Sequence, residues 1–128
     1  MRKTIAVREY MSRLPVEIDR RESLGTALRR MQSHDVRHIP VLDGAELFGI
    51  LSLQDVLDAC LRHGSDAERL AVGDVCTVGP FTVSPLETIP TVAAQMVERG
   101  VATALVTDGN VLVGIFTSTD ALRVLAHL

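Results

Sequence analysis

Two short stretches decide the fold of this chain, Gly49-Ile-Leu-Ser52-Leu-Gln-Asp55 and Gly114-Ile-Phe-Thr117-Ser-Thr-Asp120. Each has a glycine and two apolar residues before a hydroxyl, and a carboxylate three residues after that hydroxyl. The two stretches lie 65 residues apart, and the same shift aligns Val7–Leu57 with Val72–Leu122 without a gap. One register kept over this length indicates an internal duplication.

Identical residues recur along the whole alignment, and many of the other pairs are apolar with apolar. The identical pairs are Val7/Val72, Pro15/Pro80, Glu22/Glu87, Thr26/Thr91, Met31/Met96, Val36/Val101, Val41/Val106, Asp43/Asp108, Gly44/Gly109, Leu47/Leu112, Gly49/Gly114, Ile50/Ile115, Asp55/Asp120 and Leu57/Leu122. The sequence therefore predicts two repeated motifs, at residues 1–63 and 64–128.

Both copies predict the same order of elements, β-α-β-β-α. An extended segment at 16–18 or 81–83 precedes a helix with apolar residues at helical spacing, which Ser23 or Thr88 is placed to cap. Two apolar runs split by Asp-Gly then predict a hairpin, and a last helix begins near Asp55 or Asp120. We expect an α/β (α+β) protein in which two three-stranded sheets, each with two helices, pack about a pseudo-twofold axis into one module.

The hydroxyl and carboxylate of each deciding stretch lie at the start of the last helix. Free N–H groups and the helix dipole favour an anion there, so the hydroxyl can bind phosphate and the carboxylate can accept from ribose hydroxyls. The alternative is structural: Ser52 and Thr117 would be N-caps, with Asp55 and Asp120 completing capping boxes. Two copies in register favour a ligand role without excluding capping.

The chain resembles a tandem pair of cystathionine-β-synthase-type (CBS) domains over residues 7–128. The resemblance rests on the two deciding stretches, on the openings Val7-Arg-Glu-Tyr-Met11 and Val72-Gly-Asp-Val-Cys76, and on Val36-Arg-His-Ile-Pro-Val41. It implies a non-catalytic sensor module that binds AMP, ADP or ATP, with S-adenosylmethionine or NAD also possible, and signals to a separate effector protein.

The resemblance also implies two ligand clefts between the copies. One combines Thr117 and Asp120 with Ser12, Pro15, Val36, Arg37 and His38. The other combines Ser52 and Asp55 with Thr77, Pro80, Val101, Ala102 and Thr103. We expect the first to bind phosphorylated ligands more tightly, because Arg37 and His38 border it while Ala102 and Thr103 bring no positive charge.

Composition argues against several other functions. A formal net charge of −3 without a basic stripe does not favour nucleic-acid binding. No apolar run approaches the roughly 18 residues of a membrane span, and no export signal is visible, which predicts a cytoplasmic protein with Cys60 and Cys76 reduced and packed. A metal site at His34, Asp35 and His38 has too few ligands of assured geometry. No nucleophile–base pair points to an enzyme.

Two further expectations concern assembly. The last helices carry Val56, Leu57, Leu61, Leu122 and Leu125, which offer more apolar surface than one small sheet covers, so we expect a homodimer. The main alternative to nucleotide sensing is a dimerisation or protein-interaction module whose nucleotide sites are vestigial.

Overall fold

The computed structural model describes residues 5–13 and 16–128, and its contacts divide the chain into two compact units. The central unit is residues 16–80; the terminal unit is residues 81–128 with the described residues of the N-terminal segment 1–15. Each unit thus includes the opening segment of the other sequence repeat. The compact units and the motifs at 1–63 and 64–128 are therefore different divisions of the chain.

The central unit is a mixed sheet with two helices. Its elements are β2 (Ile18–Asp19), α1 (Leu24–His34), β3 (His38–Asp43), β4 (Glu46–Ser52), α2 (Leu53–His63), the 3₁₀ helices η2 (Gly64–Arg69) and η3 (Val72–Asp74), and β5 (Thr77–Val78). The strand order is β2-β3-β4-β5, with β2 parallel to β3 and the other neighbours antiparallel.

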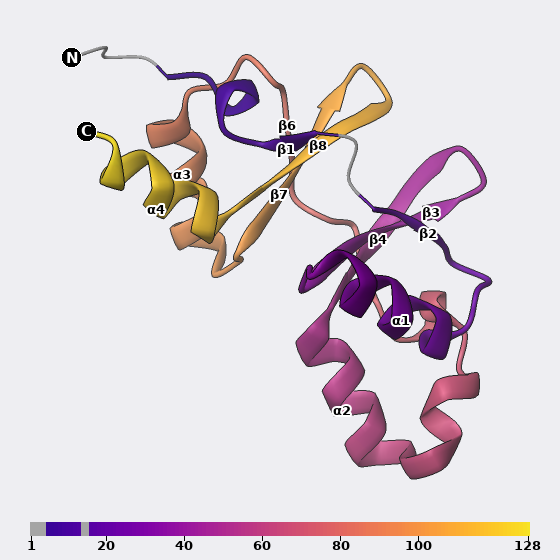
Figure 1. Ribbon diagram of the computed structural model, residues 1–128. Helices are drawn as coiled ribbons and strands as arrows, with labels where there is room; N and C mark the ends of the chain where they lie inside the picture. Colours follow the sequence, from indigo (N-terminus) through magenta and orange to yellow (C-terminus); the bar gives the residue numbers. More distant parts are fainter. Residues whose placement is uncertain (1–4, 14–15) are drawn as a thin grey trace. The chain divides into compact units, whose positions relative to one another are not determined.

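The terminal unit repeats this plan. Its elements are η1 (Val7–Glu9), β1 (Ser12–Arg13), β6 (Thr82–Val83), α3 (Ile89–Arg99), β7 (Thr103–Asp108), β8 (Val111–Thr117) and α4 (Ser118–Ala126). The strand order is β1-β8-β7-β6, with β6 parallel to β7. In Figure 1 the β7–β8 hairpin leads directly into α4, as the β3–β4 hairpin leads into α2.

The expectation of three-stranded sheets is wrong, because each sheet has four strands. The fourth strand is the short segment that opens the other repeat: β1 pairs with β8, and β5 pairs with β4. Two-residue strands carry no alternating pattern that a sequence could reveal. The mixed α and β content, with two sheets and four helices, is as predicted.

Each unit has its own apolar core beneath the sheet and helices. The central core comprises Ile18, Leu24, Ala27, Met31, Ile39, Val41, Leu51, Val56, Ala59 and Val72. The terminal core comprises Val7, Val83, Ile89, Val92, Met96, Ala104, Val106, Phe116 and Val124. Val7 and Val72 belong to the opening segments, so the exchanged segments contribute core residues as well as strands. The predicted helix periodicity is confirmed, since the buried residues lie on one face of α1 and one of α3.

Local signals behave as expected at most element ends. Gly44 and Gly109 adopt φ values of 62° and 63° in the hairpin turns, where a side chain would be strained. Ser23 caps α1 by accepting a hydrogen bond from the Thr26 N–H at 3.2 Å. Thr88 is the N-cap residue of α3, but its side chain makes no capping bond and donates instead to the Thr91 hydroxyl.

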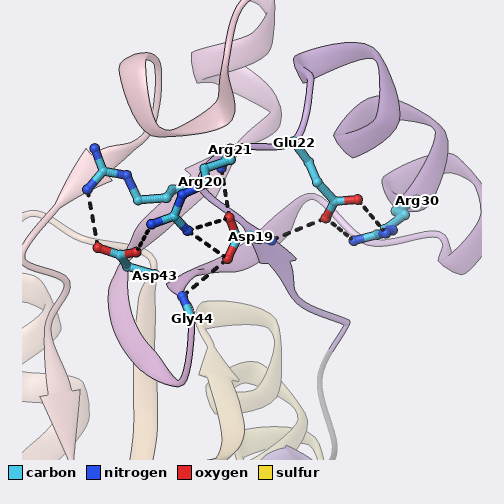
Figure 2. A network of polar contacts seen from close by, with 7 residues as sticks. All are labelled: Asp19, Arg20, Arg21, Glu22, Arg30, Asp43 and Gly44. Atoms are coloured by element: carbon cyan, nitrogen blue, oxygen red, sulfur yellow. Dashed lines mark hydrogen bonds and ion pairs between the residues drawn. The ribbon is translucent and has the colours of Figure 1, made fainter.

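A charged network marks the central unit (Figure 2). Arg21 bridges Asp19 and Asp43 at 3.1 and 2.7 Å, and Arg20 also reaches Asp43 while its guanidinium lies 4.2 Å from the centre of the Phe48 ring. The Gly44 N–H donates to Asp19 at 3.2 Å. These contacts fasten the segment before α1 to the β3–β4 turn.

Candidate functional site

The start of α2 is a complete capping box. The Ser52 hydroxyl accepts from the Asp55 N–H at 3.0 Å, and Asp55 Oδ2 accepts from the Ser52 N–H at 2.9 Å. Ser52 itself is extended, with φ −100° and ψ 159°, as an N-cap residue must be. The helix begins at Leu53, two residues before Asp55, because the capping residue Ser52 directly precedes the first helical residue.

The start of α4 has the same box with one addition. The Thr117 hydroxyl accepts from the Asp120 N–H at 3.3 Å, and Asp120 Oδ2 accepts from the Thr117 N–H at 2.8 Å and lies 3.1 Å from the Thr117 hydroxyl. Arg123 Nη1 donates to Asp120 Oδ1 at 2.8 Å. The Asp120 side chain is only 3% exposed, whereas Arg123 is 61% exposed. Capping, the structural alternative, is thus realised in both copies.

Arg37 and His38 lie beside the start of α2. His38 is the cross-strand neighbour of Ser52, and the Leu53 N–H donates to the Arg37 carbonyl at 2.8 Å. Burial is the main cause that lowers the pKa of His38. The negative charge of Asp55 raises this pKa, and the positive charge of Arg37 lowers it further. A lowered pKa keeps the imidazole neutral near pH 7. Positive charge beside the start of α2 therefore comes from Arg37 rather than from His38, while the expected role of both residues at Thr117 and Asp120 stays a prediction.

The terminal unit has the same arrangement with uncharged residues. Thr103 is the cross-strand neighbour of Thr117, and the Ser118 N–H donates to the Ala102 carbonyl at 2.9 Å. Val36 and Val101 each donate an N–H at 3.0 Å to a carbonyl of the preceding helix. These two segments therefore serve first as the turns that lead from a helix into a strand.

The opening segments also reach the helix starts. Ser12 pairs with Ile115 on β8, and Thr77 pairs with Ile50 on β4, each two residues before the capping hydroxyl. Both approaches need a glycine, since a Cβ on Gly49 would overlap the Thr77 carbonyl oxygen. Pro80 follows β5 and is half-buried. Pro15 lies outside the described residues.

The structure thus groups the predicted residues within each unit. In the central unit it brings Ser52 and Asp55 together with Thr77, Arg37 and His38; in the terminal unit it brings Thr117 and Asp120 together with Ser12, Ala102 and Thr103. The predicted combination of Thr117 and Asp120 with Val36, Arg37 and His38, and that of Ser52 and Asp55 with Val101–Thr103, join residues of both units and stay predictions.

Two hollows adjoin the helix starts, and the sequence predicted neither. In the central unit a polar hollow of about 230 Å³ is lined by Asp55, Asp58, Ala59, Arg62, His63, Asp74 and Val75. In the terminal unit an apolar hollow of about 380 Å³ is lined by Ala93, Met96, Val97, Gly100, Val101, Ala102, Ser118 and Ala121. The polar hollow includes Asp55 of the first deciding stretch. The apolar hollow includes Ser118 of the second deciding stretch, and also Val101 and Ala102 of the turn before β7.

The surface differs from the expectation in two places. Leu57, Leu61, Leu122 and Leu125 are exposed as predicted, but Val56 is only 2% exposed and belongs to the central core. Cys60 is exposed rather than packed, whereas Cys76 contacts the central core and burial raises the pKa of its thiol. Among residues 5–13 and 16–128, no group of three or more histidine, cysteine or acidic side chains could hold a metal ion.

Each of the two mixed α and β units thus has one helix start with a capping hydroxyl and a carboxylate, as expected for a tandem repeat. The CBS domain family profile matches this chain twice, at residues 7–62 and 72–127. The chain therefore belongs to the CBS domain family as a tandem pair.

Individual relatives agree with this assignment. An inosine-5'-monophosphate dehydrogenase of Korarchaeum cryptofilum is 30% identical over 120 residues, which are 92% of this chain and 24% of the dehydrogenase. The chain thus spans about a quarter of that relative. A crystal structure assigned to acetoin utilization (AcuB) in Vibrio cholerae is 29% identical with a TM-score of 0.85, covering 97% of this chain and 92% of that one.

Two further solved structures have the same fold and were determined with ligands. The CBS domain pair of protein MJ0100, in complex with 5'-methylthioadenosine and S-adenosylmethionine, is 22% identical with a TM-score of 0.86, covering 97% of this chain and 98% of that one. CBSX2 in complex with AMP is 23% identical with a TM-score of 0.81, covering 95% of this chain and 96% of that one.

None of the helices in the described part of the chain has the length and apolar character that a membrane span requires.

Proposed function

We propose that this chain is a non-catalytic regulatory module that binds an adenine nucleotide or another adenosyl ligand. The carrying observation is the hydroxyl–carboxylate box at the start of α2 and again at the start of α4, in a chain of the CBS domain family. Solved pairs of the same fold hold AMP, 5'-methylthioadenosine or S-adenosylmethionine. All three ligands share an adenosine moiety.

The chemistry of the helix starts fits such a ligand. A carboxylate accepts two hydrogen bonds from ribose hydroxyls, and free N–H groups at a helix start favour a phosphate. Arg37, exposed beside Ser52, offers a positive charge to a phosphate or a carboxylate of the ligand. The proposed contact residues are those of the two predicted sets, and the proposed compartment is the cytoplasm, where the regulated effector protein would also be found.

A melting experiment tests this proposal. Adenosine, AMP, ATP, NAD and S-adenosylmethionine are added separately, and a ligand at 100 times its dissociation constant adds about 2.7 kcal/mol of stability. At least one of them should raise the melting temperature by several degrees, whereas guanosine and inorganic phosphate should not. A flat response to every adenosyl ligand at millimolar concentration would favour the alternative, an interaction module with vestigial sites.

We also propose that the chain forms a homodimer through α2 and α4. Leu57, Leu61, Leu122 and Leu125 are 50%, 86%, 64% and 63% exposed, so both helices carry apolar surface that a second copy could cover. Light scattering at tens of micromolar should give twice the mass of the chain. Leu61→Glu together with Leu125→Glu should give the monomer mass, and a monomeric wild type contradicts the proposal.

A further inference from the structure

We propose that Arg123 closes the carboxylate of Asp120, so that Asp55 is the ribose-binding carboxylate of the wild-type chain. The proposal rests on the proposed function and names which of the two helix starts is competent. It reverses the ranking expected from sequence, in which Arg37 and His38 favoured the cleft of Asp120.

Both oxygens of Asp120 are engaged within the chain. Oδ2 accepts from the Thr117 backbone at 2.8 Å and Oδ1 accepts from Arg123 at 2.8 Å, with the Thr117 hydroxyl 3.1 Å from Oδ2. The side chain is 3% exposed. The acceptor position that remains on this nearly buried carboxylate is on Oδ1, where a ribose hydroxyl must compete with Arg123.

Asp55 has the opposite situation. Oδ2 accepts from the Ser52 N–H at 2.9 Å, and among the described residues no donor contacts Oδ1. The residue is only half-buried and lines the polar hollow of the central unit. One oxygen of this carboxylate is therefore open to a ligand hydroxyl.

A single aligned position accounts for the difference. Three residues after the motif carboxylate, where the terminal unit has Arg123, the central unit has Asp58. Asp58 accepts a hydrogen bond from Gln54 on α2 at 3.0 Å and has the same charge as Asp55, so it cannot close that carboxylate. Arg123 is thus a specificity-determining residue, which acts by occupying the acceptor.

The expected change in the dissociation constant for adenosine follows from the hydrogen bond between a ribose hydroxyl and Asp120 that Arg123 prevents. A hydrogen bond to a charged group contributes enough to change a dissociation constant roughly tenfold to a hundredfold. Titration of the wild type with adenosine, followed by calorimetry, should therefore give one tight site per chain. Adenosine is the probe because it has the ribose hydroxyls but no phosphate that Arg123 could attract.

Reciprocal variants test the assignment. Arg123→Gln should free Asp120 and add a second site of similar affinity, and Asp120→Asn in that background should remove it again. Asp58→Arg places an arginine at the matching position of α2 and should weaken the wild-type site roughly tenfold or more. Arg29→Gln, which removes one positive charge from α1, is the control for net charge. Melting curves of each variant, and Arg123→Lys as a milder change, separate lost binding from lost folding.

The outcomes separate this inference from the proposed function. If neither the wild type nor any variant binds adenosine or AMP, the proposed function fails. If the wild type binds but loses its site in Asp120→Asn rather than in Asp55→Asn, the proposed function stands and this inference is overturned. An unchanged stoichiometry in a folded Arg123→Gln variant overturns it as well.

Discussion

The central and terminal units have the same order of elements, but different contacts hold the segment that precedes the first helix of each unit. The central unit ties its β2–α1 segment to the neighbouring turn with Asp19, Arg20, Arg21 and Asp43. The aligned segment of the terminal unit is Ser84-Pro85-Leu86, which has no charge and is held by backbone bonds, such as Arg8 N–H to the Pro85 carbonyl at 3.1 Å. Duplication therefore preserved the apolar pattern, while the polar contacts diverged.

Glu22 and Glu87 show this divergence at one aligned position. Glu22 accepts from Arg30 through both oxygens, at 3.0 and 3.1 Å. Position 95, which aligns with Arg30, is glutamine, and Glu87 Oε2 is buried with no hydrogen-bond partner among the described residues. An apolar core tolerates changes in its polar surroundings, so identical residues can keep their place after losing their partner.

The largest effect is expected at the glycine where an opening segment crosses the hairpin. In Gly49→Ala the new methyl group would overlap the Thr77 carbonyl oxygen, which belongs to the backbone of β5 and cannot rotate away. We expect a loss of about 2–3 kcal/mol in the free energy of unfolding, the upper part of the range for overpacking. Urea denaturation followed by circular dichroism measures it.

Gly114→Ala is the matched variant in the terminal unit. There the nearest atom is the sulfur of Met11, at 2.5 Å, with the Ser12 carbonyl oxygen next at 2.9 Å. The methionine side chain can move, so this variant should lose less stability than Gly49→Ala. An equal or larger loss in Gly114→Ala would show that the carbonyl contact does not decide the cost.

The next effect compares the two capping carboxylates. Asp120→Ala removes the acceptor of the Thr117 N–H and of Arg123 from a nearly buried position, and we expect a loss of about 2 kcal/mol. Asp55→Ala removes one capping bond from a half-buried position and should cost about 1 kcal/mol. Thermal unfolding without ligand measures both, and a larger cost for Asp55→Ala would contradict the ion pair at Asp120.

A smaller change, this time a gain in stability, is expected when Glu87 is given the arginine partner that Glu22 has. Gln95→Arg places a guanidinium where Arg30 stands in the central unit, and it should stabilise the fold by about 0.5–1 kcal/mol. Arg30→Gln should lose a similar amount. If Gln95→Arg has no effect or destabilises, the two glutamates do not occupy equivalent surroundings.

The smallest effect is the pH dependence of His38. Burial is the main cause of its lowered pKa, so the folded chain prefers the neutral imidazole. As pH falls below about 6.5, the unfolded chain takes up the proton first and stability is lost. Between pH 7.5 and 5.5 the wild type should therefore lose slightly more stability than His38→Thr, which has the residue that the terminal unit carries there. Equal losses would show that His38 does not contribute.

The sequence by itself determined the duplication, the order of the main helices and hairpin strands, and the residues of the two capping boxes. Apolar spacing and turn glycines are local signals, because a helix or hairpin buries one face whatever its neighbours are. The capping boxes are equally local, since the hydroxyl and the carboxylate are three residues apart. For this reason Ser52, Asp55, Thr117 and Asp120 could be named without a structure.

Tertiary structure alone decided the rest. The exchange of β1 and β5 between the repeats depends on backbone pairing that two-residue strands do not reveal in their side chains. The burial of Val56 and the exposure of Cys60 depend on which face of α2 meets the sheet. From sequence, Arg123 and Asp58 are both ordinary charged residues of a helix. Only the contact between Arg123 and Asp120 in the structure distinguishes the closed carboxylate of Asp120 from the open one of Asp55. Such contacts depend on side-chain geometry, which residue spacing does not determine.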